Sequence, residues 1–391
     1  MIISPFLLVA WLLLGFLSFG PAVFIFYSMR KSSKKLWPTK VEQNYKPKIS
    51  IILPTYNEAS IIALKLTNLG RVRYDKNLVE IIMIDSNSSD GTVETAKQFL
   101  ANEPQGNLRI LTESDRRGKS NALNYALGFC TGDVVIISDA DCFWPSDILE
   151  KAIPFLADPT VGAIYCPKIL LNSNQTWITR SEEAFLRSAN ILRLGESKSG
   201  STVFFEGGFS SFKKEAFDKF DVYETGSDDC GTVVSVIENN FRAMQVPEVE
   251  FFTTFPASYR GKIAVKSRRS NQLVRVFGKC LDLLIRKRIR LARAKRTIIP
   301  NVLLYLLSPI TFFAFIISTL FLLASFPYLL AAFVFLLVPS VRFYLYEFVE
   351  SNILLFASIF AVCFGKRFSV WPQPEDRMWL KPEVLSQYNL I

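Results

Sequence analysis

The sequence predicts an α/β domain with a mainly parallel sheet, joined to apolar segments long enough to cross a membrane. Three observations lead to this fold class. Short apolar runs alternate with helical patterns between residues 48 and 160. Uncharged stretches cover residues 1–29 and 297–341. A basic segment with amphipathic periodicity, 262–296, lies directly before the second stretch.

The predicted strands are short runs of apolar, largely β-branched residues at 49–53, 80–84, 108–111 and 134–138. Helical patterns lie between them at 58–69, 91–99 and 119–127. We expect Asn57 and Asp90 to cap the helices that follow them. Strands and helices that alternate in this order form an open, mainly parallel sheet with helices on both faces. Such sheets bind ligands at the carboxyl ends of their strands.

The apolar stretches predict membrane-spanning helices. One crossing takes about 20 apolar residues, so 6–27 predicts one span and 297–341 predicts two, with a turn at 325–328. A cleaved signal peptide is the alternative for the N-terminus, but here the basic residues follow the apolar core. This charge order places residue 30 onward in the cytoplasm. The stretch 351–365 is short for a crossing, and we expect an interfacial or re-entrant segment there.

The amino-acid composition limits which catalytic groups and metal sites the protein can contain. The chain contains no histidine, which excludes Ser-His-Asp and Cys-His nucleophile systems and zinc sites built on imidazole. Proton transfer and metal binding must then rest on carboxylates, and oxygen ligands favour Mg or Mn. Six cysteines without paired spacing indicate reduced cytoplasmic thiols.

The net charge of +10 comes from one segment. Residues 262–296 hold 13 Lys and Arg and one acid, Asp282. Because this segment adjoins an apolar run, it predicts an amphipathic helix on anionic membrane lipid rather than a nucleic-acid-binding patch.

Polar motifs follow three of the predicted strands. Residues 54–58 (PTYNE) follow the first strand, Asp85 ends the second, and 139–141 (DAD) follow the fourth. Two carboxylates at i and i+2 can hold one hard cation and the diphosphate that it bridges; loop aspartates that cap local structure are the alternative. Residues 116–119 (RRGK) begin a helix, where cations suit phosphate binding, and a solvated charge run is the alternative there.

Together these motifs resemble the family 2 glycosyltransferases. The resemblance continues at 204–216, which is similar to the FFCGxxxxxRREA segment of the cellulose, chitin and hyaluronan synthase branch, with Glu206 in place of Cys. Residues 227–229 stand where that branch has TED, and 272–276 stand where it has QxxRW, with Val276 in place of Trp. The matching motifs cover about residues 48–278 in the family's order.

The resemblance implies a GT-A fold and a role for each matching residue. Asp229, beside Asp228, is the implied catalytic base, and a like-charge pair of this kind raises one pKa; a helix N-cap is the alternative role, and both can hold. Asp141, with Asp139, is implied to ligate Mg or Mn. The implied nucleotide-binding residues are Pro54, Tyr56, Glu58 and Asp85 at the nucleoside, Asp139, and Arg116, Lys119, Gln272 and Arg275 near the phosphates.

These expectations divide the chain into six parts: a transmembrane helix in 1–29, a basic linker in 30–47, the catalytic domain in 48–260, a basic interfacial helix region in 261–296, two transmembrane helices in 297–347, and a short apolar segment with a tail in 348–391. The expected protein lies in the cell membrane as a multi-pass protein with its catalytic domain in the cytoplasm.

The expected function is inverting transfer of a sugar from a nucleotide diphosphate sugar, with UDP as the expected nucleotide, to a lipid or lipid-linked glycan acceptor. The Trp that Val276 replaces lines the acceptor site in the polymerising branch, so its loss argues against processive synthesis. A short processive polysaccharide synthase is the alternative. The lack of glycine in 48–60 argues against a sugar-nucleotide pyrophosphorylase, and the retained Asp139, Asp141 and Asp229 argue against a catalytically inactive scaffold.

Overall fold

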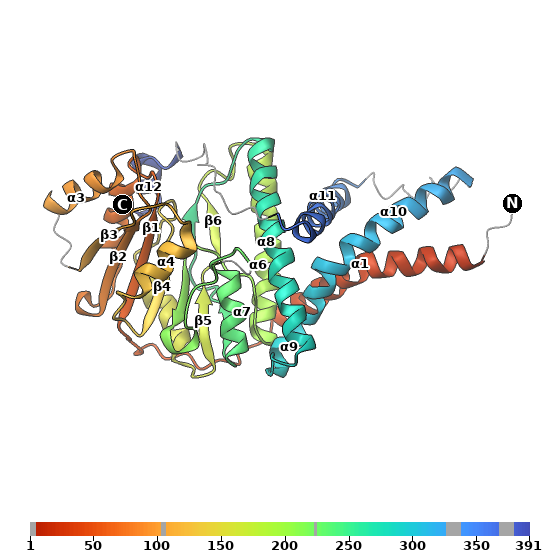
Figure 1. The fold of residues 1–391 in the computed structure, drawn as a ribbon, viewed down its shortest axis with the longest axis horizontal. Helices are drawn as coiled ribbons and strands as arrows, with labels where there is room; N and C mark the ends of the chain where they lie inside the picture. Colours follow the sequence, from red (N-terminus) through yellow and green to blue (C-terminus); the bar gives the residue numbers. More distant parts are fainter. Residues whose placement is uncertain (1–4, 103–106, 223–224, 326–337, 367–378) are drawn as a thin grey trace.

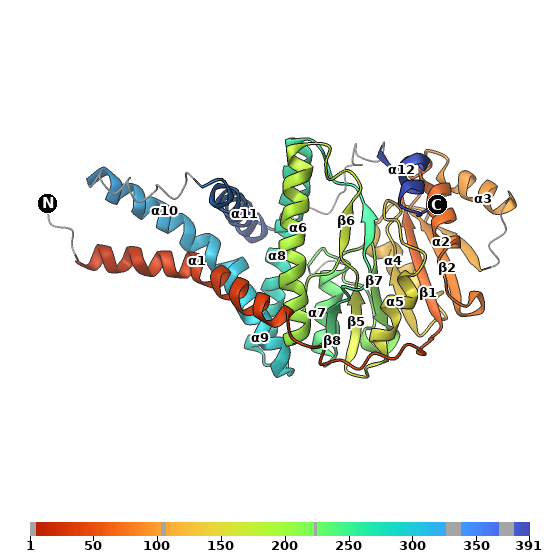
Figure 2. The same cartoon turned by 180° about the vertical axis from the view of Figure 1, so that it is seen from behind.

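The computed structural model describes residues 5–102, 107–222, 225–325, 338–366 and 379–391. The α/β domain lies at one end of the molecule, and helices α1 (Pro5–Ser33) and α10 (Ser308–Ser325) project from the other end (Figure 1). Helices α6 (Trp177–Ser199) and α8 (Tyr259–Ile285) stand between these two parts (Figure 2). They form the wall between the sheet domain and the projecting helices.

A seven-stranded sheet organises the α/β domain, in the order β3-β2-β1-β4-β7-β5-β8. Strand β7 runs antiparallel to its neighbours, and the other pairs are parallel. This arrangement confirms the predicted fold class. The strands are β1 (Ile49–Thr55), β2 (Val79–Asp85), β3 (Leu108–Thr112), β4 (Val134–Ile137), β5 (Val161–Tyr165), β7 (Ser210–Lys213) and β8 (Arg242–Gln245), and β6 (Lys168–Leu170) pairs with β9 (Phe251–Thr253) in a second, two-stranded sheet.

The central strands are apolar on both faces because helices cover both sides of the sheet. Ile49, Ile51 and Ile52 of β1 are all fully buried, and they divide between the two core clusters on opposite faces. The other helices are α2 (Ile62–Gly70), α3 (Thr92–Asn102), α4 (Lys119–Leu127), α5 (Ile148–Ala152), α7 (Cys230–Glu238), α9 (Ala292–Val302), α11 (Pro339–Cys363) and α12 (Pro382–Gln387), with short 3-10 turns η1 (Lys76–Leu78), η2 (Ile153–Ala157) and η3 (Lys214–Ala216) and a π-helical turn η4 (Leu303–Leu307).

One predicted helix cap is wrong. Helix α2 begins at Ile62, and Asn57 lies before it with φ of 55°, in the left-handed region that asparagine tolerates. The Asn57 side chain accepts a hydrogen bond from the backbone N–H of Ser89, so it joins two loops. Asp90 does receive the backbone N–H of Thr92, the first residue of α3, at 3.1 Å.

Three helices in the described part of the chain are long and apolar enough to cross a membrane: Phe6–Ser33, Ala292–Leu323 and Tyr344–Cys363. The second combines α9, η4 and α10. The turn expected at 325–328 falls almost entirely outside the described residues. The stretch 351–365, expected to be interfacial or re-entrant, is the C-terminal part of α11 and its end. Arg342, Glu347 and Glu350 interrupt the apolar pattern of this helix, which explains why the predicted short apolar stretch begins only after them, at residue 351.

Helix α1 packs against α6, one of the two helices that form the wall described above. A Cβ atom at Gly195 of α6 would lie 2.0 Å from the carbonyl oxygen of Met29, so this crossing requires glycine. Farther along α1, the Trp11 indole donates a hydrogen bond to Thr319 Oγ1 of α10 at 2.8 Å. Helix α1 therefore connects a second candidate membrane helix with the sheet domain.

The C-terminal residues return to the sheet domain. The Asn68 side chain of α2 donates a hydrogen bond to the carbonyl oxygen of Leu390 at 2.7 Å. Leu380, Leu385 and Leu390 are buried in the core cluster that also contains β1 residues. The segment expected to be a tail is thus part of the domain core.

Candidate active site

The DAD motif and the start of α4 meet at the carboxyl end of β4. Lys119 Nζ lies 2.7 Å from Asp139 Oδ1 and 2.9 Å from Asp228 Oδ2. A Cβ atom at Gly207 would lie 2.6 Å from Asp139 Oδ2 and 2.9 Å from Lys119 Nζ. The glycine of the FFEGG segment therefore leaves room for the ion pair between the two predicted site residues.

Four carboxylates line this end of the site, those of Asp139, Asp141, Asp228 and Asp229, and three cations act on them, those of Lys65, Lys119 and Arg268. Burial raises the pKa of Asp139, against the lowering effect of Lys119, and the charges of Asp141 and Asp228 raise it further. Burial and the neighbouring Asp228 likewise raise the pKa of Asp229, the effect predicted for this like-charge pair. Burial lowers the pKa of Lys119, but Asp139 and Asp228 together raise it above its ordinary value. The excess of negative charge suits a bound cation.

The DAD carboxylates fit the divalent metal implied by the resemblance. One oxygen each of Asp139 and Asp141 and the Cys142 sulfur lie within 4.8 Å of one another. Burial raises the pKa of the Cys142 thiol well above its ordinary value, so this sulfur stays protonated and is a poor ligand. The two carboxylates are hard oxygen ligands, which suit Mg or Mn.

The loop that precedes α7 presents the second carboxylate pair. Asp229 caps α7, because its Oδ1 accepts hydrogen bonds from the backbone N–H of Cys230 at 2.6 Å and from the hydroxyl of Ser227. Asp228 instead pairs with Lys119. The capping contacts hold the Asp229 carboxylate in a fixed orientation beside the DAD motif.

Helix α8 lies against this loop. The Gln272 side chain donates a hydrogen bond to the carbonyl oxygen of Gly226 at 2.6 Å. Gly226 has φ of 72°, and a Cβ atom there would lie 2.4 Å from Arg275 Nη1. The two residues predicted from the QxxRW position thus both reach the loop that carries Asp228 and Asp229.

Arg268 also lines the cavity beside these residues, and it is not among the predicted site residues. Burial and the neighbouring Arg269 lower the pKa of Arg268 to about 10, while Asp228 and Asp229 act in the opposite direction. Arg268 precedes Gln272 by four residues, so the two lie on the same face of α8. That spacing is the sequence signal from which Arg268 could have been found.

The predicted nucleoside residues lie at the ends of β1 and β2. Asp85 is buried, and its oxygens accept hydrogen bonds from Thr55 Oγ1 at 3.0 Å, Ser88 Oγ at 2.6 Å and the Ser88 backbone N–H at 2.8 Å. The Arg116 guanidinium carbon lies 3.7 Å from the centre of the Tyr56 ring. These residues lie near the ends of β1, which is next to β4, and of β2, which is one strand farther away. Pro54 at the end of β1 and the buried Glu58 belong to the same group of residues.

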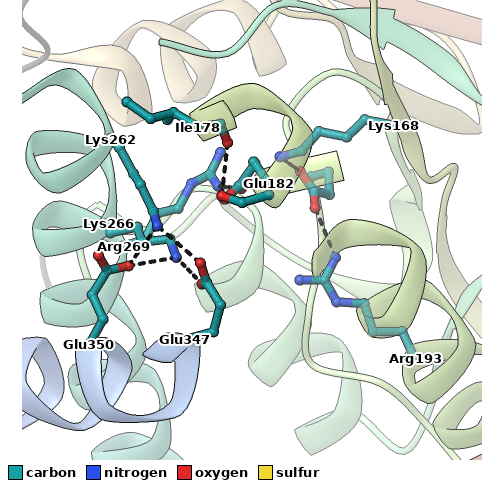
Figure 3. A network of polar contacts seen from close by, with 11 residues as sticks. Lys168, Ile178, Glu182, Arg193, Lys262, Lys266, Arg269, Glu347 and Glu350 are labelled. Atoms are coloured by element: carbon teal, nitrogen blue, oxygen red, sulfur yellow. Dashed lines mark hydrogen bonds and ion pairs between the residues drawn. The ribbon is translucent and has the colours of Figure 1, made fainter. Parts of the chain in front are cut away.

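Glu206, which replaces the Cys of the related segment, is a buried counter-ion. Its two oxygens lie 2.6 Å from Lys168 Nζ and 2.8 Å from Arg193 Nη1. Burial raises the pKa of Glu206, but Lys168 and Arg193 outweigh this and hold it at about 2. Figure 3 shows Lys168 and Arg193 extending toward this pair of contacts from different elements. The sequence gives no sign of these partners, which lie on β6 and α6.

A cavity of about 800 Å³ extends from the carboxylates around Lys119 to the projecting helices. One end is lined by predicted site residues, namely Lys119, Asp139, Asp141, Asp228, Asp229 and Gln272. The other end is lined by apolar side chains of α1, α6 and α11, among them Ala22, Phe26, Leu192, Phe348 and Leu355. Val276 also lines this cavity. The carboxylate cluster therefore opens onto an apolar chamber formed by α6 and by the candidate membrane helices α1 and α11.

Comparison with known proteins places the sheet and its motifs in a family. The sequence model described as Glycosyl transferase family 2 matches residues 50–221, which include β1, β4, the DAD motif and Glu206. This part of the chain therefore resembles a family 2 glycosyltransferase domain. Gln272, Arg275 and the projecting helices lie beyond the matched segment.

Curated relatives of this glycosyltransferase domain differ in what they act on. The beta-monoglucosyldiacylglycerol synthase of Synechocystis sp. is 30% identical over 138 residues, which cover 35% of this chain and 29% of that protein. The N-acetylglucosaminyltransferase of Rhizobium meliloti is 24% identical over 228 residues, which cover 55% of this chain and 53% of that protein. The chain thus spans less than a third of the first relative and about half of the second.

One solved structure resembles the whole fold. The mannosyltransferase PcManGT from Pyrobaculum calidifontis, solved in complex with GDP-Man and Mn²⁺, is 28% identical with a TM-score of 0.77. The match covers 92% of this chain and 100% of that chain. It confirms the GT-A fold and extends the likeness beyond the glycosyltransferase domain to most of the helices around it.

Proposed function

We propose that this protein transfers a sugar with inversion from a nucleotide diphosphate sugar to the hydroxyl group of a lipid or lipid-linked acceptor. The observation that carries this proposal is one cavity with carboxylates at one end and, at the other, apolar side chains of α6 and of two candidate membrane helices. The carboxylates suit a metal–diphosphate donor. The apolar end suits an acceptor that enters from the bilayer.

The donor site is proposed to lie along the carboxyl ends of β2, β1 and β4. Asp85 and the neighbouring Glu58, Tyr56 and Pro54 would hold the nucleoside, and Arg116 would lie near the phosphates. Asp139 and Asp141 would ligate Mg or Mn, which supplies positive charge to the departing diphosphate. The sequence analysis expected UDP, whereas PcManGT was solved with GDP-Man, so donors of both kinds belong in the test.

Asp229 is proposed to remove the proton of the acceptor hydroxyl. The hydroxyl oxygen then forms its bond to the anomeric carbon as the bond from that carbon to the diphosphate breaks, and the electron pair leaves with the diphosphate. The raised pKa of Asp229 makes it a stronger base than an ordinary carboxylate. Lys119, Gln272 and Arg275 would hold the diphosphate while its charge develops.

The membrane orientation is part of the same proposal. Arg30 and Lys31 form the last turn of α1, and two more lysines follow within four residues. Cationic residues flank the cytoplasmic ends of membrane helices. The catalytic domain would therefore face the cytoplasm, with the basic side of α8 close to the membrane surface.

A donor and acceptor panel tests the function. Purified protein in lipid nanodiscs would be incubated with Mn²⁺ and radiolabelled GDP-mannose, UDP-glucose or UDP-N-acetylglucosamine, with nucleotide release and lipid-extractable label measured together. We expect one donor to give a labelled lipid product that carries a single added sugar. Long, water-soluble polymer would instead support the short processive synthase, and no transfer from any donor with a total lipid extract would contradict the proposal.

The apolar end of the cavity is tested on α6. Ala189 lines the cavity, whereas Ala184 on the same helix is exposed and outside it. We expect Ala189→Trp to raise the KM for the lipid acceptor, because the indole fills the chamber, and Ala184→Trp to leave it unchanged. Equal acceptor kinetics in the two variants would contradict the proposed acceptor path.

A further inference from the structure

Helices α8 and α11 are joined by four charged side chains buried between them. Lys262 Nζ lies 3.0 Å from Glu347 Oε1 and 3.0 Å from Glu350 Oε2. Lys266 Nζ lies 2.6 Å from Glu347 Oε2 and 2.9 Å from Glu350 Oε2. Figure 3 shows the two lysines and two glutamates pointing at one another, so each lysine contacts both glutamates. We call these four residues the α8–α11 clamp.

The clamp is buried and lies at the edge of a candidate membrane helix. The Lys262 side chain is completely buried, and those of Glu347 and Glu350 are 8% and 7% exposed. Both glutamates belong to the segment Tyr344–Cys363, which is apolar enough to cross a membrane. Ionised side chains in such a segment are costly unless paired, so they mark positions with a specific role. Glu350 also accepts a hydrogen bond from Tyr346 at 2.7 Å.

A buried pair of opposite charges adds little net stability compared with well-packed apolar side chains, but it fixes geometry. In the clamp, two lysines one turn apart face two glutamates three residues apart. Sliding or rotation of α11 along α8 breaks several of the four contacts at once. The clamp therefore sets the register between the two helices.

The same helix carries the site residues. Lys266 precedes Gln272 by six residues, which is about 9 Å along a helix, and Gln272 and Arg275 contact the loop that presents Asp229. Lys266 and Glu347 themselves line the cavity together with Arg268 and Gln272. Any displacement of α8 at the clamp is thus transmitted to the side chains beside the catalytic carboxylates.

We propose that Lys262, Lys266, Glu347 and Glu350 are positioning residues for glycosyl transfer: they fix α8 against α11 so that Gln272 and Arg275 close over the donor while the acceptor lies between the same two helices. This inference rests on the proposed function for its kinetic consequence. Its structural part, the register between α8 and α11, is independent of that function.

The first experiment breaks and rebuilds the clamp in the full-length protein in nanodiscs. Glu347→Gln with Glu350→Gln removes both anions, and the fourfold swap Lys262→Glu, Lys266→Glu, Glu347→Lys and Glu350→Lys restores all four opposite-charge contacts. Asp282→Asn is the control, because it removes an exposed ion pair on α8 at 2.8 Å from Arg286. The kcat for sugar transfer, corrected for the folded fraction, is compared across the four proteins.

We expect the double glutamine variant to lose about 10- to 100-fold in kcat, the scale of misplaced reacting groups, and the swap to regain most of it. The control should match the wild type. Unchanged kcat per folded molecule in the glutamine variant would overturn the proposal. So would a folded swap variant that regains nothing, because a positioning role depends on the restored contacts.

Hydrogen–deuterium exchange of α8 peptides separates this inference from the proposed function. Residues 262–276 should exchange faster in the glutamine variant and return to wild-type protection in the swap variant. This readout needs neither donor nor acceptor. If the wild type transfers no sugar but exchange follows this pattern, the proposed function is contradicted and the proposed register between α8 and α11 is supported. If residues 262–276 keep wild-type protection in the glutamine variant, the clamp does not set this register.

Discussion

At the proposed donor end of the cavity, Asp139 and Asp141 directly follow β4, Lys119 begins α4, and Asp228 and Asp229 lie in the loop before α7. At the proposed acceptor end, the polar groups come from β6, α6, α8, α11 and the loop that carries Glu206, and their contacting residues lie up to 88 positions apart in the chain. The donor end joins its charges to a shared ammonium, Lys119, and leaves an excess of carboxylates. The acceptor end pairs its buried charges closely, as in the contacts of Glu206 with Lys168 and Arg193.

Because of this difference in charge balance, the two ends of the cavity suit different roles. An excess of negative charge at the donor end favours a metal and the diphosphate that it carries. Paired charges at the acceptor end hold elements in place without attracting a new ion. Variants at the donor end should therefore change the chemical step, whereas variants at the acceptor end should change acceptor use, helix register or stability.

The largest effect is expected at Asp229. Asn at this position keeps the α7 cap, since Asn and Asp cap helices equally well, but it cannot accept the acceptor proton. We expect kcat to fall about 10²- to 10⁴-fold, the usual contribution of a general base, with nucleotide binding retained. Nucleotide release and calorimetric titration measure the two quantities. Asp218→Asn, at an exposed position, is the control, and substantial turnover by Asp229→Asn would remove its role as base.

Asp141→Asn should weaken metal-dependent donor binding as well as turnover. A metal that stabilises the leaving diphosphate contributes several kcal/mol, so we expect a loss of about 100-fold or more. A chelator should have the same effect on the wild type, and added Mn²⁺ should reverse it only there. Equal Mn²⁺-dependent nucleotide affinity in wild type and variant would show that the metal is held elsewhere.

Gly207→Ala tests the space around the Lys119–Asp139 pair. The added methyl group must displace Asp139 Oδ2 or Lys119 Nζ, which lie 2.6 Å and 2.9 Å from its position. We expect a loss of about 10- to 100-fold in kcat with little change in acceptor KM. Gly278→Ala on α8 is the matched control, because no atom lies within 4 Å of its Cβ position; a similar loss in both would indicate a general effect of alanine.

The smallest effect is expected in stability, at two buried glutamates with opposite pKa shifts. Burial raises the pKa of Glu196 to about 7, against hydrogen bonds from Asn301 and Thr202. Glu196 keeps its proton up to a higher pH in the folded protein than in the unfolded chain. The free energy of unfolding therefore falls as pH rises from 4.5, the ordinary pKa of this group, toward 7. Glu206, held at about 2 by Lys168 and Arg193, contributes stability that is lost as pH falls through 4.5 toward 2.

We expect Glu196→Gln to flatten the fall in Tm between pH 5 and 7, an effect on the order of 2 kcal/mol. Glu206→Gln should instead reduce the fall in Tm below pH 5. It should also lower Tm at neutral pH, because it leaves the buried Lys168 and Arg193 without their anion. Thermal unfolding in detergent from pH 3 to 8 measures both. A Glu196→Gln profile that matches the wild type from pH 5 to 7 would contradict the pKa of about 7.

The donor end was largely predictable from the sequence, and the acceptor end was not. Strands β1, β2 and β4 are buried on both faces, so their apolar runs mark them, and site residues at their ends follow within one to five positions. Asp139 and Asp85 were predicted as site residues in this way. Lys266 and Glu347 pair across 81 positions, and periodicity within either segment does not indicate the other. The charged residues of α11 interrupt its apolar pattern, so the pattern did not predict one continuous helix there. These charges are tolerated in the structure because they pair with lysines of α8.

The crossing at Gly195 and Met29 has a consequence for biosynthesis. Helix α1 leaves the ribosome before α6 and α10, but its contacts join it to residues of those helices such as Gly195 and Thr319, the latter 308 positions after Trp11. Contacts of such high sequence separation form late in folding. With the proposed membrane topology, α1 would therefore lie in the bilayer without these neighbours until α6 and α10 have been made. A Gly195→Leu substitution would then leave early insertion intact and fail only at the final closure of the helices, as a full-length chain that is inserted but sensitive to protease.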